Sequence, residues 1–583
     1  MLRRLLMPAE QASRDLHGAA DEARGVSPPR AHGDRSDTAM TSRSYALPGL
    51  ADFNLPFRFA FFILVFGLLG GCALLPPGSD FPKTASAALP SPDQTRLGQQ
   101  FESSARDHGG TSAFRVLSVG VDGFLARAQM IHTAERTLDL QYFIFRQDET
   151  GQLLTRALLR AADRGVRVRI LIDDGDTLEG DEQIAVLESH PQIEIRIFNP
   201  FVYRGHTGLF RAVEFAFTAS RLDYRMHNKL MVVDNAIALL GGRNIGDEYF
   251  QVDPDSQFGD DDVFAAGPIV KKLSNTFDEF WNSAVAIPVE GLATGKQTGA
   301  ALEAYRKTLD EHRSQLKADG TDYASRVASG EPLAGMIAGR LPLVWAHAQL
   351  VYDSPEKKRV ANGEMVGKLM HRSVAAAAAA VQSELLMVTP FFIPGHAGMQ
   401  MFADLRKRGA RVRVLTNSLE STPELVAHSG YMHYRLPLLA DGVELYEVRA
   451  LLGNAHGSGE TLAATRSGNY ALHAKLFVFD RQKLYIGSMN FDERSRSLNT
   501  EIGLIIDSRE LAQQTAARFE SIVAPENSYG VALQADGLDG SSRLLWRTRE
   551  NQRAVEYDRE PARSDWQRMK VNFLSLMPLD SEL

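Results

Sequence analysis

The chain has 583 residues, a length that accommodates about two to four domains, and 44% hydrophobic with 23% charged residues is typical of a globular protein. Its formal net charge of −8 at pH 7 argues against a nucleic-acid binder, because such proteins usually carry a basic surface. The single cysteine, Cys72, excludes a disulfide within the chain.

The N-terminal segment predicts targeting rather than a folded domain. Residues 1–56 are rich in Arg, Asp and Ser and lack hydrophobic periodicity, which is typical of disorder. Residues 59–75 are apolar or small and follow Arg58, which suits a signal-peptide core better than a spanning helix. The sequence LGGC, which ends at Cys72, is similar to a bacterial lipobox and implies cleavage before a lipidated cysteine. An uncleaved anchor with an incidental cysteine is the alternative.

We therefore expect a leader and lipoprotein-type signal peptide over residues 1–75, followed by a Pro/Ser/Gly-rich tether over residues 76–111. Acyl chains on Cys72 would hold the mature protein on a membrane. The expected location is the bacterial cell envelope, with the protein facing the periplasm or the exterior.

A strand, a helix and a second strand are predicted near the start of the globular part. Residues 136–145 are rich in β formers, and residues 151–165 have apolar side chains at helical spacing before a terminal glycine. Residues 166–174 form the next strand, so the order predicts a βαβ unit with a parallel pair of strands.

The same order returns later in the chain. A strand is predicted at residues 383–394, a helix at 398–409 and a strand at 410–418. Because the repeat spans whole halves, the expected fold class is α/β, with two similar halves packed together and one active site at their interface. We place the first half at 112–290, a helical connection at 291–339, the second half at 340–526 and a C-terminal extension at 527–583.

One motif occurs in both halves. The segment HNKLMVVDNAIALLGGRN, residues 227–244, returns as HAKLFVFDRQKLYIGSMN, residues 473–490. A His and a Lys two positions apart on an extended strand point to the same face, so two such pairs can converge on one site. The repeated positions are His227, Lys229, Asp234 and Asn244, then His473, Lys475, Asp480 and Asn490.

These residue types suit phosphodiester chemistry. Lys and Asn donate hydrogen bonds to phosphate oxygens, and a neutral His attacks phosphorus or transfers protons near pH 7. Two His on opposite sides of a phosphodiester would form a covalent phosphohistidine with one ring and protonate the leaving alcohol with the other. The spacing does not suit a metal site, since Lys is a poor ligand and no Cys partner occurs. We therefore expect metal-independent turnover without a cofactor.

The motifs resemble the paired HKD signatures of the phospholipase D superfamily, and the resemblance covers about residues 112–526. The segments RVRILIDDGDT, LTNSLESTPELVAHSGY and NFDERSRSLNTEIGLII are similar to the cardiolipin synthase C-like branch. The resemblance implies two phospholipase D-like halves and phosphatidyl transfer. The product would be cardiolipin, made from phosphatidylglycerol and a second phospholipid, with phosphatidylethanolamine as a candidate.

The resemblance also assigns site residues. Its catalytic set falls on His227, His473, Lys229, Lys475, Asp234 and Asp480, and its phosphate-binding set on Asn244, Asn490 and the two Lys. The two Asp favour a structural over a chemical role. By analogy, one His is the nucleophile and the other the acid/base, and we expect the nucleophile to be His227.

The family has an acidic residue after each motif that orients a His. Glu501 matches this position in the second half, and Asp260 is favoured over its neighbours Asp261 and Asp262 in the first. The small residues before each Asn either keep the site open for phosphate or pack tightly; these are Gly241, Gly242, Gly487 and Ser488.

The expected partners are phospholipid substrates and a membrane surface, and no nucleic acid; the need for a partner protein is open. Residues 206–222 and 564–578 are candidate membrane-facing segments, and packing against the domain is the alternative for both. Three other functions stay open: a hydrolase that releases phosphatidic acid, a phosphodiesterase or nuclease, and a non-catalytic lipoprotein. Lipid products would separate them.

Overall fold

The computed structural model describes residues 78–176, 181–204, 208–252, 257–292, 298–452, 470–536 and 541–577. Leu75–Leu583 form one unit, to which the following description applies. The predicted signal peptide and Cys72 lie outside the described residues. Within those residues, no helix combines the length and the apolar character needed to cross a membrane.

The first half is built on a mixed sheet with the spatial order β9–β4–β3–β2–β5–β6–β8–β1. The strands are β1 (Ser112–Leu117), β2 (Thr137–Tyr142), β3 (Arg167–Asp173), β4 (Ile193–Phe198), β5 (Leu230–Val233), β6 (Ile237–Gly241), β8 (Asp262–Ala266) and β9 (Ala286–Pro288). Strands β2, β3 and β4 are parallel, and α5 (Glu149–Asp163) connects β2 to β3. The predicted βαβ unit is confirmed.

The second half repeats this sheet as β18–β13–β12–β11–β15–β16–β17–β10. Its strands are β10 (Val344–Tyr352), β11 (Glu384–Val388), β12 (Arg411–Asn417), β13 (Glu444–Val448), β15 (Leu476–Phe479), β16 (Lys483–Gly487), β17 (Ile502–Asp507) and β18 (Ser528–Asp536). Every strand of one half has a counterpart in the other, with the same parallel or antiparallel pairing. The α/β fold class and the duplication are therefore confirmed.

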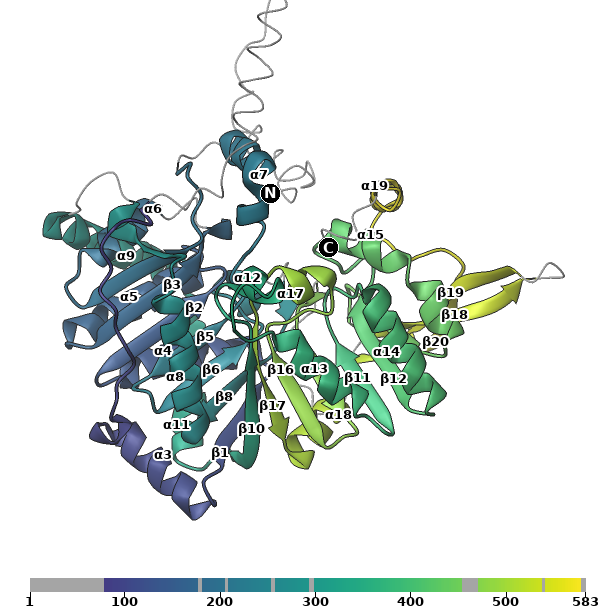
Figure 1. Ribbon diagram of the computed structural model, residues 1–583, viewed down its shortest axis with the longest axis horizontal. Helices are drawn as coiled ribbons and strands as arrows, with labels where there is room; N and C mark the ends of the chain where they lie inside the picture. The colour runs from purple at the N-terminus through teal and green to yellow at the C-terminus, as the bar shows by residue number, and fades with distance from the viewer. Residues whose placement is uncertain are drawn as a thin grey trace, which may run out of the picture. The chain divides into compact units, whose positions relative to one another are not determined.

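The two halves are joined edge to edge. Strand β1 pairs with β10 in antiparallel orientation, with Ala113 opposite Trp345. Including β19 (Ser541–Glu550) and β20 (Arg553–Tyr557), the described residues form one sheet of 18 strands (Figure 1). The backbone groups at the edge of each half are thus paired by the other half.

Helices cover both faces of the sheet. In the first half α4 (Gly120–Thr133) and α5 cover the outer face, and α13 (Met370–Ala379) and α14 (Gly395–Lys407) do so in the second. On the other face, α8 (Pro268–Trp281) and α18 (Arg509–Ile522) bury apolar side chains in a core to which both halves contribute (Figure 1). The two halves therefore share a hydrophobic core as well as a sheet.

Two segments differ from the predicted boundaries. Part of the predicted tether forms α3 (Arg96–Asp107), because Leu97, Phe101 and Ala105 recur at helical spacing and are buried against the first half. Strand β18 lies in the predicted C-terminal extension but takes the place in the second half that β9 takes in the first. Its antiparallel pairing with β13 joins distant parts of the sequence, and no local sequence pattern predicts it.

The predicted helical connection contains α9 (Gly299–Ala318), α10 (Tyr323–Val327) and α11 (Pro332–Ile337). Only Leu302 and Leu309 of α9 are buried, so this helix is largely exposed to solvent. The other elements are η1 (Pro92–Gln94), η2 (Asp174–Asp176), α6 (Asp181–Glu188), α7 (Gly208–Leu222), η3 (Asp247–Tyr249), β7 (Gln257–Gly259), η4 (Val289–Gly291), α12 (Lys357–Ala361), α15 (Leu425–Met432), α16 (Arg435–Ala440), β14 (Tyr470–Leu472), α17 (Glu493–Ser497) and α19 (Asp565–Leu574).

Candidate active site

The two motif histidines are anchored by backbone contacts to the opposite halves. Strand β14 pairs in parallel with β7 of the first half, and the N–H of His473 donates to the carbonyl of Gly259 at 2.8 Å. The N–H of His227 donates to the carbonyl of Thr500, in the second half, at 2.9 Å. Each motif therefore begins where its chain segment lies against the other half, which brings both histidines to the boundary.

The carboxylates that contact the histidine rings are exchanged between the halves. The Nδ1 atom of His227 lies 2.9 Å from Glu501, and that of His473 lies 2.5 Å from Asp260. Each carboxylate follows one motif in the sequence but contacts the histidine of the other motif. A carboxylate on Nδ1 holds that nitrogen as the N–H donor and makes Nε2 the acceptor. Nζ of Lys475 lies 3.2 Å from Nε2 of His473, so this Nε2 has a donor beside it in the free site.

Of the three neighbouring aspartates in the first half, only Asp260 contacts a motif histidine. Asp261 accepts a hydrogen bond from Ser118 and pairs with Arg518, whereas Asp262 pairs with the buried Arg127. The sequence pattern placed an acid here, and the structure distinguishes among the three by the direction of each side chain.

The small residues before each motif Asn fit the two carboxylates differently. In the second half Ser488 Oγ donates a hydrogen bond to Glu501. At the equivalent position in the first half, a Cβ atom on Gly242 would lie 2.1 Å from Oδ1 of Asp260, so no side chain fits. The shorter Asp brings its carboxylate closer to the backbone than Glu does. Tight packing, one of the two interpretations of these residues, therefore accounts for Gly242.

Two buried lysines lie beside the histidines. Nζ of Lys229 donates to the carbonyl of His227 at 2.5 Å, and Nζ of Lys475 does the same to His473. Burial lowers the pKa of Lys475 to about 8, and it lowers the pKa of Lys229 well below its usual value. An anion bound between the two partly desolvated lysines would stabilise the charged form of both.

Both histidines are neutral in the free site near pH 7. Burial lowers the pKa of His227 well below its ordinary value, and the two lysines lower it further. Burial and Lys475 lower the pKa of His473 to about 3, against the opposing effect of Asp260. A neutral imidazole with a free Nε2 can act as nucleophile or base.

The two orienting acids differ in charge. Burial raises the pKa of Glu501 to about 7, with Lys229 as the largest opposing effect. Burial acts in the same sense on Asp260, but His473 and Lys475 outweigh it and hold the pKa of Asp260 below its ordinary value. Near pH 7, Asp260 is fully ionised and Glu501 is only partly so.

Aromatic rings enclose both histidines. Phe143 packs edge-on against His227 at a ring-centroid distance of 5.2 Å, and Phe258 stacks on His473 at 5.3 Å. Tyr249 lies edge-on to His473 at 5.3 Å. Phe143 directly follows β2, whereas Phe258 lies in β7 and Tyr249 in η3. The rings limit the access of water to the site.

The two motif asparagines are in different states. Asn244 is fully used, since Oδ1 accepts from the N–H of Ile144 at 3.2 Å and Nδ2 donates to Tyr249 at 2.9 Å. Asn490 is 7% exposed, and its Oδ1 has no hydrogen-bond partner among the described residues. Asn490 is thus the motif amide that is free to bind a substrate in this state.

The motif aspartates do not join the histidines. Asp234 accepts from the N–H groups of residues 135–137, and Asp480 accepts from those of residues 382–384. Both have positive φ, 53° in each case, in the turn after β5 or β15. The carboxylates hold the start of β2 and β11, and no hydrogen bond or ion pair joins either of them to a motif His or Lys in the described part of the chain. These contacts fit the structural role favoured for both aspartates.

Two residues that the sequence did not single out hold the start of each motif. Asp173 at the end of β3 accepts from the N–H of Met226 at 2.7 Å, and Asn417 at the end of β12 accepts from that of Leu472 at 2.8 Å. Each partner precedes a motif His by one residue. The equivalence of the two strand ends is the signal that could have identified this pair.

A buried lysine supports Glu501 from behind. The N–H of Glu501 donates to Asp353 at 3.1 Å, and Asp353 pairs with Nζ of Lys357 at 2.9 Å.

No group of three or more His, Cys, Asp or Glu side chains in the described ranges is arranged to hold a metal ion.

Comparison with known proteins agrees with this architecture. A family model described as "Cardiolipin synthase, PLD-like domain" matches residues 128–281 and 375–523, one stretch in each half. The chain is 35% identical over 505 residues to cardiolipin synthase C of Escherichia coli (strain K12), covering 86% of this chain and 99% of that protein. It is 24% identical over 393 residues to a cardiolipin synthase of Halalkalibacterium halodurans, covering 67% and 62% respectively.

Among solved structures, phosphatidylserine synthase of Haemophilus influenzae Rd KW20 aligns with a TM-score of 0.48 and 12% identity, over 74% of this chain and 92% of that one. Two α/β halves that bring paired His–Lys motifs to one boundary define a phospholipase D-type enzyme. The chain belongs to the phospholipase D superfamily, in its cardiolipin synthase C-like branch.

Proposed function

We propose that the chain is a phosphatidyltransferase that makes cardiolipin from phosphatidylglycerol and a second phospholipid through a phosphohistidine intermediate. The observation that carries the proposal is the pair of neutral histidines, each oriented by a carboxylate of the other half and accompanied by a buried lysine. The coverage of 99% of a cardiolipin synthase C supports the product.

In the first step Nε2 of His227 attacks the phosphorus of the donor phospholipid. The new P–N bond forms as the P–O bond to the headgroup alcohol breaks, and His473 donates a proton to the leaving oxygen. His473 is neutral in the free site, so it takes up a proton from solvent when the substrate binds. The ionised Asp260 stabilises the protonated His473, and the negative phosphodiester offsets the two lysines that lower its pKa in the free site. Lys229, Lys475 and Asn490 bind the phosphoryl oxygens as charge builds.

In the second step His473 takes the proton from a glycerol hydroxyl of phosphatidylglycerol. That oxygen attacks phosphorus, the P–N bond breaks and His227 is restored, so cardiolipin leaves and no atom is unaccounted for. Water in place of this hydroxyl would give phosphatidic acid. The aromatic rings around both histidines favour transfer over hydrolysis because they limit water.

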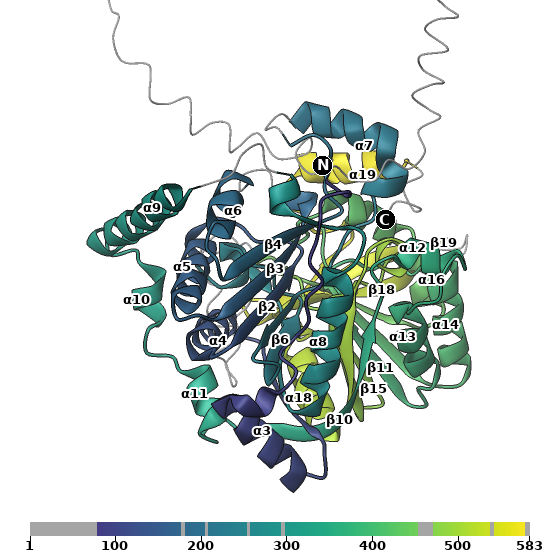
Figure 2. The same ribbon diagram turned by 60° about the vertical axis from the view of Figure 1, so that its left-hand side comes forward.

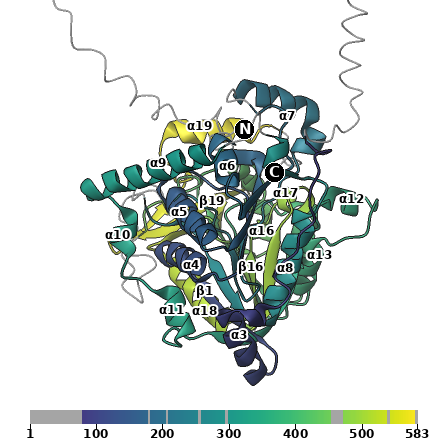
Figure 3. The ribbon, with the colours of Figure 1, turned by 90° about the vertical axis from the view of Figure 1, so that its left-hand side faces the viewer.

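We further propose that the enzyme meets its substrates at a membrane through an exposed apolar surface on α7 and α19. Large apolar side chains that are more than one-third exposed gather there: Val202, Phe210, Val213, Trp566, Met569, Phe573, Leu576 and Met577. Figures 2 and 3 show α7 and α19 at the same end of the unit. Helix α19 buries Val571 and Leu574 on one side, so it both packs on the domain and presents an apolar face.

The predicted lipid anchor would hold the protein in the cell envelope, facing the periplasm or the exterior. The apolar run that precedes the LGGC sequence supports this proposal. Mass spectrometry of the membrane-extracted protein would show an acylated N-terminal Cys72, and Cys72→Ala would release the protein from membranes. An uncleaved N-terminus would contradict the lipoprotein proposal.

The test of function uses the full chain in mixed phospholipid vesicles with a chelator present. Cardiolipin should form from phosphatidylglycerol, and a rise on addition of phosphatidylethanolamine would identify the second substrate. His227→Ala and His473→Ala should each abolish the product, and a trapped phosphoenzyme in only one of them would assign the nucleophile. Phosphatidic acid without cardiolipin would make the chain a hydrolase, and DNA cleavage without a lipid product would make it a nuclease.

A further inference from the structure

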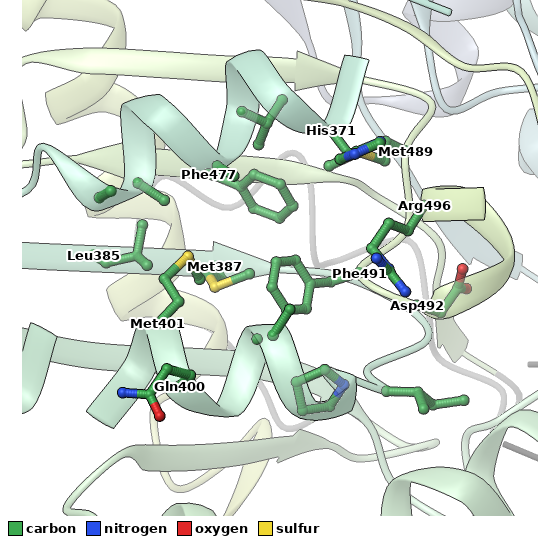
Figure 4. Close-up of a pocket in the computed structure, with 18 of the residues that line it drawn as sticks. His371, Leu385, Met387, Gln400, Met401, Phe477, Met489, Phe491, Asp492 and Arg496 are labelled. Carbon is green, nitrogen blue, oxygen red and sulfur yellow. The ribbon is translucent and has the colours of Figure 1, made fainter. Parts of the chain in front are cut away.

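A groove lies on the outer face of the second half, between α13, α14 and the sheet (Figure 4). Its volume is about 450 Å³, within the roughly 300–1,000 Å³ of small-molecule sites. The floor consists of two cross-strand pairs, Leu385 with Phe479 and Met387 with Phe477. We call this space the α13/α14 groove.

The groove is open because its helices carry small side chains. The face of α13 that lines it presents Val374, Ala375, Ala378 and Ala379, and that of α14 presents Ala397 and Gly398. Residues three and four positions apart share one face of a helix, so these alanines and glycine leave a continuous gap above the sheet.

The first half closes the equivalent space with its own side chains. Phe124 of α4 lies 13 residues before β2 begins at Thr137 (137 − 124), and His371 of α13 lies 13 residues before β11 begins at Glu384 (384 − 371). Phe124 packs against Phe250 and Tyr323 at ring-centroid distances of 5.7 and 5.1 Å. At His371 the second half has a polar ring instead.

Two further positions follow the same exchange. Phe250 lies six residues after the motif Asn of the first half (250 − 244), where the second half has Arg496 (496 − 490). Ile131, buried in α4, corresponds to Ala378 of α13. The opening is therefore a property of the second half and not a requirement of the fold.

One end of the groove is polar and adjoins the active-site motif. His371, Asp492 and Arg496 gather at this end in Figure 4, while Leu385 and Met401 lie further along the groove with Gln400. Asp404 and Arg408 line the groove as well. Asn490 also lines the groove, and its buried Oδ1 has no partner in the described ranges. Nδ1 of His371 is buried without a partner there as well. Rotation of the Asn490 amide would turn Nδ2 toward the groove, and Nδ2 is the donor that an ester oxygen of a ligand needs.

We propose that the α13/α14 groove binds one acyl chain of a phospholipid substrate, with the ester end toward Asn490 and the methyl end over the Leu385–Phe479 pair. The proposal rests on the proposed function. An acyl chain is apolar beyond its ester, which matches the apolar floor of the two cross-strand pairs. The ester end is placed toward the motif because the phosphate must lie there to react. The thioethers of Met387 and Met401 adapt to a flexible chain.

The first experiment fills the groove. Ala378→Phe in the full chain should lower kcat/KM for dipalmitoyl phosphatidylglycerol about tenfold, the effect of losing burial of about two methylene groups. Turnover of the dihexanoyl lipid should change less than twofold. Ala378→Ile, which introduces the side chain found at the equivalent position of the first half, is the milder variant if the larger one unfolds. Ala376→Phe is the matched control, because Ala376 lies on the same helix but is exposed and does not line the groove.

The second experiment does not depend on turnover. Phosphatidylglycerol with a diazirine at the end of one acyl chain is photolysed with wild-type protein and with His227→Ala in vesicles. Peptides of α13, α14 and β15 should be labelled, and Ala378→Phe should reduce this labelling at least fivefold.

Labelling confined to α7 and α19, or equal loss of activity with both chain lengths, would overturn the groove proposal. A diazirine fatty acid that labels the groove where the phospholipid does not would also overturn it, in favour of a free fatty acid. Groove labelling without any phospholipid turnover would sustain the binding site and reject the proposed function.

Discussion

The Nδ1 atom of His227 lies 2.9 Å from a carboxylate oxygen of Glu501, 274 residues further along the chain and in the other half. The relationship is reciprocal, because Asp260 of the first half contacts His473 of the second. Neither half holds a complete His–carboxylate pair of its own. The unit of function is the interface, and any change that separates the halves removes both oriented histidines together.

Replacing either orienting acid should impair turnover. Glu501→Gln and Asp260→Asn keep the shape of the side chain but let the wrong histidine tautomer form, so kcat should fall on the order of 10²- to 10⁴-fold. Vesicle assays of cardiolipin formation measure the loss. Ser488→Ala, which removes the hydrogen bond to Glu501 and the one that the hydroxyl accepts from the N–H of Ile502 but keeps the carboxylate, should cost much less turnover. Near-normal turnover in both acid variants would reject the reciprocal arrangement as the source of catalytic orientation.

The raised pKa of Glu501 predicts a pH dependence. With a pKa of about 7, the carboxyl is protonated below that pH and cannot hold the Nδ1–H form of His227. Turnover also needs protonated His473, whose pKa in the free site is about 3. The value of kcat/KM should therefore stay level as pH rises toward about 7, because the gain of ionised Glu501 offsets the loss of protonated His473, and it should fall above about 7. Asp260 has a lowered pKa and stays ionised over this range, so it adds no second limb.

Measurements of kcat/KM from about pH 5.5 to about 8.5 cover both sides of the expected midpoint and test this titration. Glu501→Gln should leave a slow rate that falls steadily across this range, without the break near pH 7. Persistence of the same midpoint in that variant would assign the titration to another group.

Gly242→Ser should be poorly tolerated although Ser occupies the equivalent position 488. A Cβ at residue 242 would meet Asp260 at 2.1 Å, so the carboxylate must move away from His473. We expect a loss of about 1–3 kcal/mol in the free energy of unfolding from overpacking, together with a large loss of kcat. Denaturant titration and vesicle assays measure the two effects.

The matched control is Ser488→Gly, which creates no overlap and should leave the free energy of unfolding closer to that of the parent protein. If Gly242→Ser keeps full activity, the spacing between Gly242 and Asp260 does not constrain the site.

The exposed face of α19 should contribute to vesicle binding. In a Cys72→Ala background, Trp566→Ser with Phe573→Ser should weaken binding to phosphatidylglycerol vesicles more than tenfold, since each ring buries apolar area worth about 1.5–3 kcal/mol. Sedimentation with vesicles gives the partition coefficient. Val366→Ser is the control, because Val366 is equally apolar and fully exposed but lies outside the α7 and α19 surface. Unchanged partitioning of the double variant would exclude α19 from membrane contact.

Local patterns accounted for much of the fold. Helical spacing and β-rich runs located α5, β3, α14 and β12, and the repeated order identified the duplication before any pairing was known. The repeated pattern also marked the motif residues, and the family resemblance suggested both acids. It could not show that Glu501 faces His227, because the exchange between halves depends on the pairing of β1 with β10 and not on sequence separation.

Other features had no local signature. The alanines of α13 predict a helix whether or not other side chains pack against it. The α13/α14 groove exists because no aromatic side chains fill the space beside them, which the helix sequence alone does not show. Asp234 and Asp480 belong to the same repeated motif as the lysines. Their carboxylates nevertheless bind the backbone of β2 and β11, because each Asp lies in the turn that follows its strand. A fixed spacing between motif residues therefore does not show that their side chains point to the same site.

The edge pairing of β1 with β10 has a consequence for assembly. Two separate polypeptides with these folds would have to find each other in solution, and the fraction of complete sites would fall on dilution. Here one covalent connection, which includes α9, α10 and α11, makes the encounter intramolecular and sets a fixed effective concentration. The molecule is a covalent dimer of its own halves, so its specific activity should not change with protein concentration.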